Sequence, residues 1–105
     1  MATKEMLFLA CFESDVLAEK KTITIRDESD SHYDVGSRVN AVIYQEGRQF
    51  GRLDIVGVEP VLFDELNETH AVQENMSLER LREVLEDIYP GTKQLYVVSF
   101  RLVPK

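Results

Sequence analysis

Apolar and polar residues alternate along several short stretches of this chain, with the period of two that is typical of half-buried β-strands. Two neighbouring stretches flank Gln45, Glu46 and Gly47, a polar group with a glycine that indicates a hairpin turn. Pro60 is expected to end the second of these strands, because proline has no backbone N–H to donate. The pattern predicts strands over residues 6–10, 22–26, 38–44, 49–58 and 95–102.

A helical period of three and four residues is clearest after Ser77, a residue type that often caps a helix N-terminus. The helix carries one apolar stripe, which we expect to face the core, and Pro90 with Gly91 should end it. The stripe consists of Leu78, Leu81, Leu85 and Ile88.

A shorter helix is expected over residues 14–20, with Ser14 as its N-cap, and residues 62–75 form an irregular, helix-like segment. Five or six strands with two or three short helices predict an α+β fold, a small mixed β-barrel rather than a parallel βαβ sheet. No linker, repeat or low-complexity stretch divides the sequence. We therefore expect one domain over residues 1–105.

Composition limits which kinds of binding partner and which cellular compartment we expect for this protein. Twelve Lys and Arg against nineteen Asp and Glu give a net charge of −7, which disfavours stable nucleic-acid binding. The longest apolar run, residues 6–12, is far too short to span a membrane and makes an unconvincing signal peptide. A single cysteine, Cys11, excludes an internal disulfide and is expected in the core. We predict a cytoplasmic protein without a membrane partner.

The densest chemistry lies in residues 21–27, where a predicted strand carries an amine, two hydroxyls, a guanidinium and a carboxylate. Alternation places Thr22, Thr24 and Arg26 on one face of this strand, and the two isoleucines between them on the core face. Thr24 is a candidate nucleophile, which Lys21 can activate only if Lys21 lies outside the regular strand. The alternative is that the threonines are only good strand formers and Lys21 an ordinary solvated lysine.

The spacing Lys21-x-x-Thr24-x-Arg26 resembles the signature of ASCH domains, a PUA-like family of small β-barrels. Residues 21–29, 70–76 and 87–91 resemble the bacterial ASCH subfamily of N(4)-acetylcytidine amidohydrolases, and the likeness spans nearly the whole chain. It implies a small-molecule nucleoside substrate, with Lys21 as proton acceptor, Thr24 as nucleophile and Glu74 as proton donor. Glu19 stands where ASCH domains commonly have glycine, so we expect a slightly different exit from the preceding helix.

Two mechanisms use these residues. In the first, neutral Lys21 takes the proton of Thr24, whose oxygen attacks the acetyl carbonyl, and Glu74 protonates the departing nitrogen. In the second, Glu74 activates water directly and Lys21 stays a cation that stabilises the oxyanion. In the second mechanism Thr24 only positions the substrate. In the first, Arg26 is our candidate for binding the substrate carbonyl or the developing oxyanion.

No cofactor or metal is expected. His32 and His70 lack zinc-binding spacing, and His70 is interpreted as a surface or hydrogen-bonded histidine. Residues 27–32 resemble a calcium loop but lack its glycine, so we interpret them as a polar loop near the site. Two non-catalytic functions remain open, an RNA-binding PUA-like module and a nucleoside-sensing regulator. The oligomeric state and the exact form of the substrate also remain open.

Overall fold

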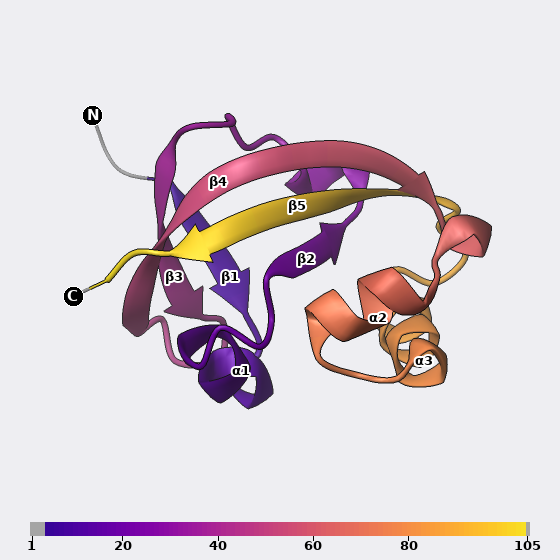
Figure 1. The fold of residues 1–105 in the computed structure, drawn as a ribbon, viewed down its shortest axis with the longest axis horizontal. Helices are drawn as coiled ribbons and strands as arrows, with labels where there is room; N and C mark the ends of the chain where they lie inside the picture. Colours follow the sequence, from indigo (N-terminus) through magenta and orange to yellow (C-terminus); the bar gives the residue numbers. More distant parts are fainter. Residues whose placement is uncertain (1–3, 105) are drawn as a thin grey trace.

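The computed structural model describes residues 4–104, which form a five-stranded mixed sheet flanked by three α-helices (Figure 1). Across the sheet the strands follow the order β1-β3-β4-β5-β2. The strands are β1 (Glu5–Phe8), β2 (Ile23–Arg26), β3 (Arg38–Ile43), β4 (Gln49–Leu62) and β5 (Gln94–Leu102), and the helices are α1 (Glu13–Leu17), α2 (Glu68–Glu74) and α3 (Leu78–Ile88).

The sheet is a curved, open version of the predicted barrel. β1 runs parallel to β3, and the other neighbouring strands are antiparallel. β1 and β2 are the two edges of the sheet and are not paired with each other. The α+β class and the strand number are confirmed, while the closure expected of a barrel does not occur.

β4 runs through Pro60 to Leu62, so the expected strand end at Pro60 is wrong. β3 pairs with β4 only as far as Asp54, whereas β5 pairs with β4 as far as Leu62. One side of β4 therefore lacks a neighbouring strand at Pro60, and a residue without an N–H fits there. The hairpin at residues 45–47 is confirmed, with Gly47 at φ +68° and its N–H donating to Ile43 O at 2.7 Å.

Two apolar clusters lie along the sheet. One joins α1 to β1, β3 and the adjoining halves of β4 and β5, through side chains such as Val16, Phe8 and Phe100. The other packs α3 against β2 and the far halves of β4 and β5, with Leu81 and Leu85 at its centre. Figure 1 shows α2 and α3 together on the far side of β2 from α1. All four residues of β2 are buried: Ile23 and Ile25 belong to the second cluster, and Thr24 and Arg26 lie on the other face of the strand.

Three local predictions need correction. β1 ends at Phe8 and a 3₁₀ turn over Ala10–Phe12 follows, so Cys11 is exposed rather than in the core. Because that turn leads directly into α1, the helix begins at Glu13 and no side chain caps it, Ser14 included. Ser77 does cap α3, accepting a hydrogen bond from Arg80 N at 3.1 Å.

The stripe on α3 is core-facing only in part. Leu81 and Leu85 are buried, whereas Ile88, at the last turn, is 46% exposed. Segment 62–75, expected to be irregular, contains a 3₁₀ turn and the regular helix α2. None of the helices in residues 4–104 has the length and apolar character needed to cross a bilayer.

Candidate active site

Lys21 lies in the link between α1 and β2, as the sequence predicts. The backbone N–H groups of Lys20 and Lys21 both donate to Asp15 O, at 2.9 and 3.1 Å, after the chain turns through Glu19. Glu19 itself adopts the left-handed conformation, with φ +59°. The expectation of a different helix exit is therefore wrong, because Glu19 takes the conformation that glycine would favour, at some cost in strain.

Glu74 is the last residue of α2, and the helix ends in a left-handed turn at Asn75, with φ +58°. The side chain of Asn75 donates to Asp15 Oδ1 at 3.1 Å, and Thr22 N donates to Gln73 O at 2.8 Å. These two bonds tie the end of α2 to the link before β2. Residues far apart in the sequence are thereby brought into direct contact.

Lys21 Nζ donates a hydrogen bond to Glu74 Oε2, and both side chains are almost completely buried. Burial is the main cause of a lowered pKa for Lys21, opposed by the nearby Glu74 charge. It also raises the pKa of Glu74, against the opposing effect of Lys21. The low-dielectric surroundings therefore move both groups towards their neutral forms.

Two further contacts define the surroundings of this pair. The Phe12 ring lies 4.8 Å from Lys21 Nζ, a cation–π distance that covers the amine on one side. Glu74 Oε1 is buried and has no hydrogen-bond partner among residues 4–104. A buried carboxyl oxygen without a partner can accept a hydrogen bond from a ligand or carry a proton.

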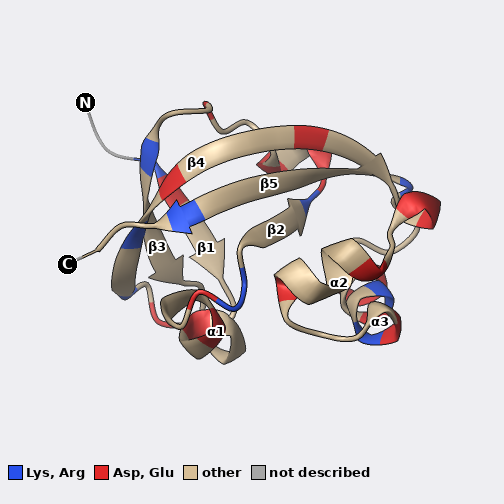
Figure 2. Cartoon of the chain, in the orientation of Figure 1, with Lys and Arg blue, Asp and Glu red and all other residues tan. Residues whose placement is uncertain are grey.

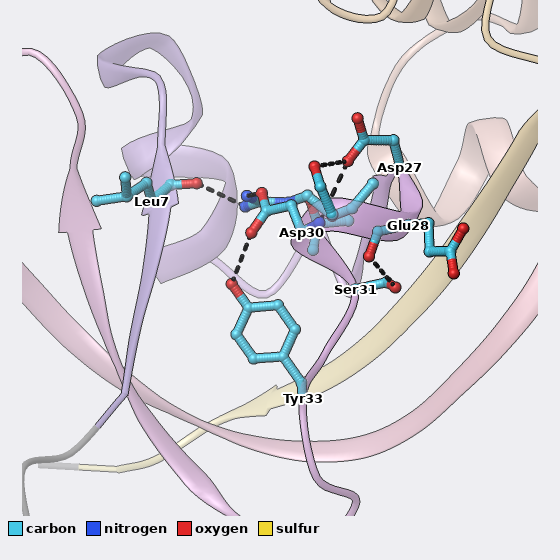
Figure 3. Close-up of polar contacts among 9 residues, drawn as sticks. Leu7, Asp27, Glu28, Asp30, Ser31 and Tyr33 are labelled. Carbon is cyan, nitrogen blue, oxygen red and sulfur yellow. Dashed lines mark hydrogen bonds and ion pairs between the residues drawn. The ribbon is translucent and has the colours of Figure 1, made fainter.

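Thr24 and Arg26 lie together on β2 and contact each other directly. Arg26 Nε donates to Thr24 Oγ1 at 2.9 Å. Arg26 Nη2 donates to Leu7 O at 2.5 Å, which links the two unpaired edges of the sheet, and Nη1 donates to Asp30 Oδ2 at 2.5 Å. Figure 3 shows Leu7 and Asp30 within this network. Sequence analysis did not predict the link to Leu7, because no local pattern encodes it.

A cavity of about 320 Å³ brings the predicted residues together: Lys21, Thr24, Arg26 and Glu74 all line it. This volume lies at the lower end of the range for small-molecule sites. Its remaining walls are largely apolar and aromatic. They come from the end of β1, the following turn, β2, the residue after β3 and the core-facing side of α3, for example Leu9, Phe12, Tyr44, Leu85 and Tyr89.

The sequence reasoning also selected residues that lie elsewhere. Thr22 precedes β2 and lines a separate small recess beside Phe100, so it does not share the site of Thr24. His70 Nδ1 accepts from Asn67 N at 3.2 Å at the start of α2, which confirms its interpretation as a hydrogen-bonded histidine. Asp30 also lines the cavity, but the sequence predicts only that its loop, residues 27–32, lies near the site.

The curved sheet with its helices has the fold of ASCH domains. An ASCH domain from Lactobacillus crispatus superposes with a TM-score of 0.78 at 16% identity, over 96% of this chain and 79% of that one. The ASCH protein of Zymomonas mobilis gives 0.74 at 14% identity, over 92% and 65%. No family model matches the sequence.

Curated relatives define the family more narrowly. A protein of Vibrio vulnificus named N(4)-acetylcytidine amidohydrolase is 53% identical over 102 residues, covering 97% of this chain and 98% of its own length. Proteins of the same name from Edwardsiella ictaluri and Haemophilus influenzae are 48% and 40% identical, over 94% and 98% of this chain and 92% and 99% of their own lengths. The chain belongs to the N(4)-acetylcytidine amidohydrolase family.

Proposed function

We propose that this protein is a cytoplasmic, single-domain enzyme that hydrolyses the acetyl amide of N(4)-acetylcytidine to give cytidine and acetate. The observation that carries the proposal is the buried Lys21–Glu74 pair, which lines the same cavity as the Thr24 hydroxyl. The names of its relatives, matched over nearly the full length of the chain, supply the substrate.

The pair can supply a base and an acid at once. Transfer of one proton from Lys21 Nζ to Glu74 Oε2 converts the ion pair into a neutral amine and a neutral carboxylic acid. Burial favours this neutral form, because it disfavours both charges. The enzyme thereby obtains a general base and a general acid without changing the net charge of its site.

In the first step, Lys21 takes the proton of Thr24, and Oγ1 forms a bond to the acetyl carbonyl carbon. Glu74 gives its proton to the cytidine exocyclic nitrogen as the carbon–nitrogen bond breaks. Cytidine leaves, and the acetyl group remains as an ester on Thr24. The transfer requires Nζ and Oγ1 to lie within hydrogen-bond reach in the substrate complex.

In the second step, a water molecule takes the place of the departed cytidine. The Glu74 carboxylate accepts a proton from this water, whose oxygen attacks the ester carbonyl. The Lys21 ammonium returns its proton to Thr24 Oγ1 as the ester bond breaks, which releases acetic acid. Both side chains are then in the neutral forms in which the cycle began.

Arg26 enters this mechanism through Thr24. Three of the five N–H donors of its guanidinium are bonded to Thr24, Asp30 and Leu7. The bond to Oγ1 places positive charge where the alkoxide develops, which favours loss of the hydroxyl proton. The remaining two N–H groups have no partner among residues 4–104 and can donate to the substrate carbonyl, so the predicted substrate-binding role of Arg26 is part of the proposal.

An RNA-binding function has less support. In an RNA-binding protein, Lys21 and Arg26 would contact phosphates. Both side chains are buried and already paired with carboxylates. Figure 2 shows Lys and Arg interleaved with Asp and Glu over strands and helices, instead of gathered along one stripe. A protein surface that binds the phosphate backbone of RNA typically carries a continuous stripe of Lys and Arg.

The direct test is to incubate the purified protein with N(4)-acetylcytidine and to follow cytidine and acetate by chromatography. We expect turnover with one acetate released per cytidine, and loss of turnover in Thr24→Val. The matched control is Thr22→Val, which makes the same change two residues earlier and outside the cavity. Binding without product release would reject the enzyme and support a nucleoside sensor.

A further inference from the structure

Asp30 connects Arg26 to a second buried side chain. Its Oδ2 accepts from Arg26 Nη1 at 2.5 Å, and its Oδ1 accepts from Tyr33 OH at 3.4 Å. Tyr33 is 7% exposed and packs within the apolar cluster of β1 and β3. The connections run from Tyr33 through Asp30 and Arg26 to the Thr24 hydroxyl.

The 3₁₀ turn that carries Asp30 is held by its own hydrogen bonds (Figure 3). Asp27 Oδ1 accepts from Asp30 N at 3.2 Å and from Ser29 Oγ at 2.7 Å. Ser31 Oγ donates to Glu28 O at 2.9 Å. These bonds hold the backbone of the turn, while Arg26 and Tyr33 hold the Asp30 carboxylate, although this side chain is 43% exposed.

The guanidinium of Arg26 is consequently held on three sides. Leu7 O and Asp30 fix its two terminal nitrogens, and the Phe8 ring lies 5.5 Å from its central carbon. A planar group held in this way can point Nε in only one direction, which is towards Thr24 Oγ1. Oγ1 then keeps one lone pair for attack and one proton to give.

We propose that Asp30 is a positioning residue for the reaction, which fixes the Thr24 hydroxyl through Arg26. The inference rests on the proposed function for its effect on turnover, but the positioning itself is a property of the unliganded protein. A misplacement of about 1 Å at a reacting atom can cost about 100-fold in rate, so loss of the Asp30 bond has a measurable effect.

The kinetic test compares Asp30→Ala and Asp30→Asn with the wild type. Asp30 lines the cavity, but its carboxylate is bonded to Arg26 and Tyr33. Because it acts through Arg26, we expect Asp30→Ala to lower kcat by about 10- to 100-fold with little change in KM. Asp30→Asn keeps an oxygen that accepts from Nη1, and should recover most of kcat. Equal kcat in all three proteins would overturn the proposal.

Asp54→Ala is the matched control. It breaks another arginine–aspartate pair, Arg38 Nε to Asp54 Oδ1 at 2.8 Å, which joins β3 to β4 outside the cavity. We expect its kcat to equal that of the wild type. A fall in kcat similar to that of Asp30→Ala would mean that the effect is general destabilisation, and would overturn the positioning role.

Tyr33→Phe provides a second variant that keeps the core ring and removes only the hydroxyl. Because the bond to Asp30 is long, we expect a smaller fall in kcat than in Asp30→Ala. The fall should disappear when Tyr33→Phe is made in the Asp30→Ala background, since both act along one chain of contacts. Additive effects of the two substitutions would contradict the connection.

A substrate-free readout separates this inference from the proposed function. Nitrogen-15 NMR follows the Nε–H of Arg26, which is buried and bonded to Thr24. We expect its signal to be protected from exchange in the wild type and in Asp54→Ala, and to be lost in Asp30→Ala. If the wild type fails to hydrolyse N(4)-acetylcytidine, the proposed function falls. A protected signal in Asp30→Ala would overturn the positioning role in either case.

Discussion

Lys21 and Glu74 form an ion pair inside the protein, although they are 53 positions apart in the sequence. Each lies close to a left-handed backbone turn at a residue other than glycine, Glu19 before Lys21 and Asn75 after Glu74. These are the two non-glycine residues of positive φ within residues 4–104. Strained turns of this kind often mark functional sites, because the surrounding contacts must hold them.

Replacing one partner of this buried pair should destabilise the protein more than replacing both partners together. Lys21→Met leaves a buried carboxyl without a partner, and Glu74→Leu leaves a buried amine, each at a cost of about 3–5 kcal/mol in unfolding free energy. The double variant Lys21→Met/Glu74→Leu contains no uncompensated charge and should be more stable than either single variant. Urea denaturation measures the three values, and all three variants should be inactive.

The surface pair of Arg38 and Asp54 is the control for this experiment, because both side chains are exposed. The corresponding substitutions there should change stability little, singly or together. If the loss of unfolding free energy in the Lys21/Glu74 double variant equals the sum of the losses in the two single variants, the two groups do not act as a coupled buried pair.

The pH dependence of kcat/KM distinguishes the two mechanisms when the wild type is compared with Glu74→Gln, because in the wild type both mechanisms require one proton on the Lys21–Glu74 pair. If Lys21 is the base and Glu74 the acid, activity requires deprotonated Lys21 and protonated Glu74. Activity then falls at low pH as Lys21 gains a proton, and falls at high pH as Glu74 loses one. Burial, the main cause of both pKa shifts, lowers the pKa of Lys21 and raises that of Glu74, and so increases the fraction of the pair in the neutral form that this mechanism requires.

Glu74→Gln tests the assignment. The Glu74 charge raises the pKa of Lys21, so its removal should lower that pKa and move the acidic limb to lower pH. The alkaline limb should disappear, since glutamine does not titrate. If Glu74 instead activates water beside a cationic Lys21, the residual activity of the variant would keep an alkaline limb, because Lys21 must still carry its proton. A pH–rate profile over both limbs decides between these outcomes.

The sequence predicts which residues lie together at the cavity more accurately than it predicts the hydrogen-bond partners of those residues. The period of two on β2 correctly placed Ile23 and Ile25 in the core and Thr24 with Arg26, because alternation is a local property of a strand. The contacts of Arg26 with Leu7 and Asp30 depend on how the sheet curves and on the turn after β2. No periodic pattern encodes either feature.

The errors in the predicted fold have the same cause: a local sequence pattern does not show which segments are neighbours in the folded chain. The strand end at Pro60 was predicted from proline alone, but the missing N–H does no harm where β4 has no neighbour on one side. Cys11 was expected in the core because it lies in an apolar run, but part of that run turns outwards and lines the cavity. Apolar residues around a binding site look like core residues in the sequence.

The covalent role of Thr24 predicts an adduct that can be trapped. Acid quenching during turnover, followed by mass spectrometry of peptides, should show one acetyl group on the peptide of Thr24. Thr24→Ser should keep the adduct and part of the activity, whereas Thr24→Val should lose both. Thr24→Val should also lose about 1–3 kcal/mol of stability, since it leaves the buried Arg26 Nε without an acceptor.

Direct attack by water gives a different set of results. No adduct would form at any quench time, and Thr24→Val would keep measurable turnover. Incubation in oxygen-18 water adds no distinction, because both routes place one solvent oxygen in the acetate. The peptide mass is therefore the measurement that decides whether Thr24 is the nucleophile.

Glu19 provides a test of the strain stored beside the site. A residue other than glycine in the left-handed region costs about 1–2 kcal/mol, and glycine removes this cost while adding entropy to the unfolded chain. We expect Glu19→Gly to raise the unfolding free energy by about 1 kcal/mol in urea denaturation, with kcat and KM unchanged, because the backbone already has the required φ. Asn75→Gly is the matched comparison. Asparagine tolerates this conformation, and its side chain donates to Asp15, so glycine should bring no gain there. Equal effects at the two positions would show that backbone strain at Glu19 is not what the substitution relieves.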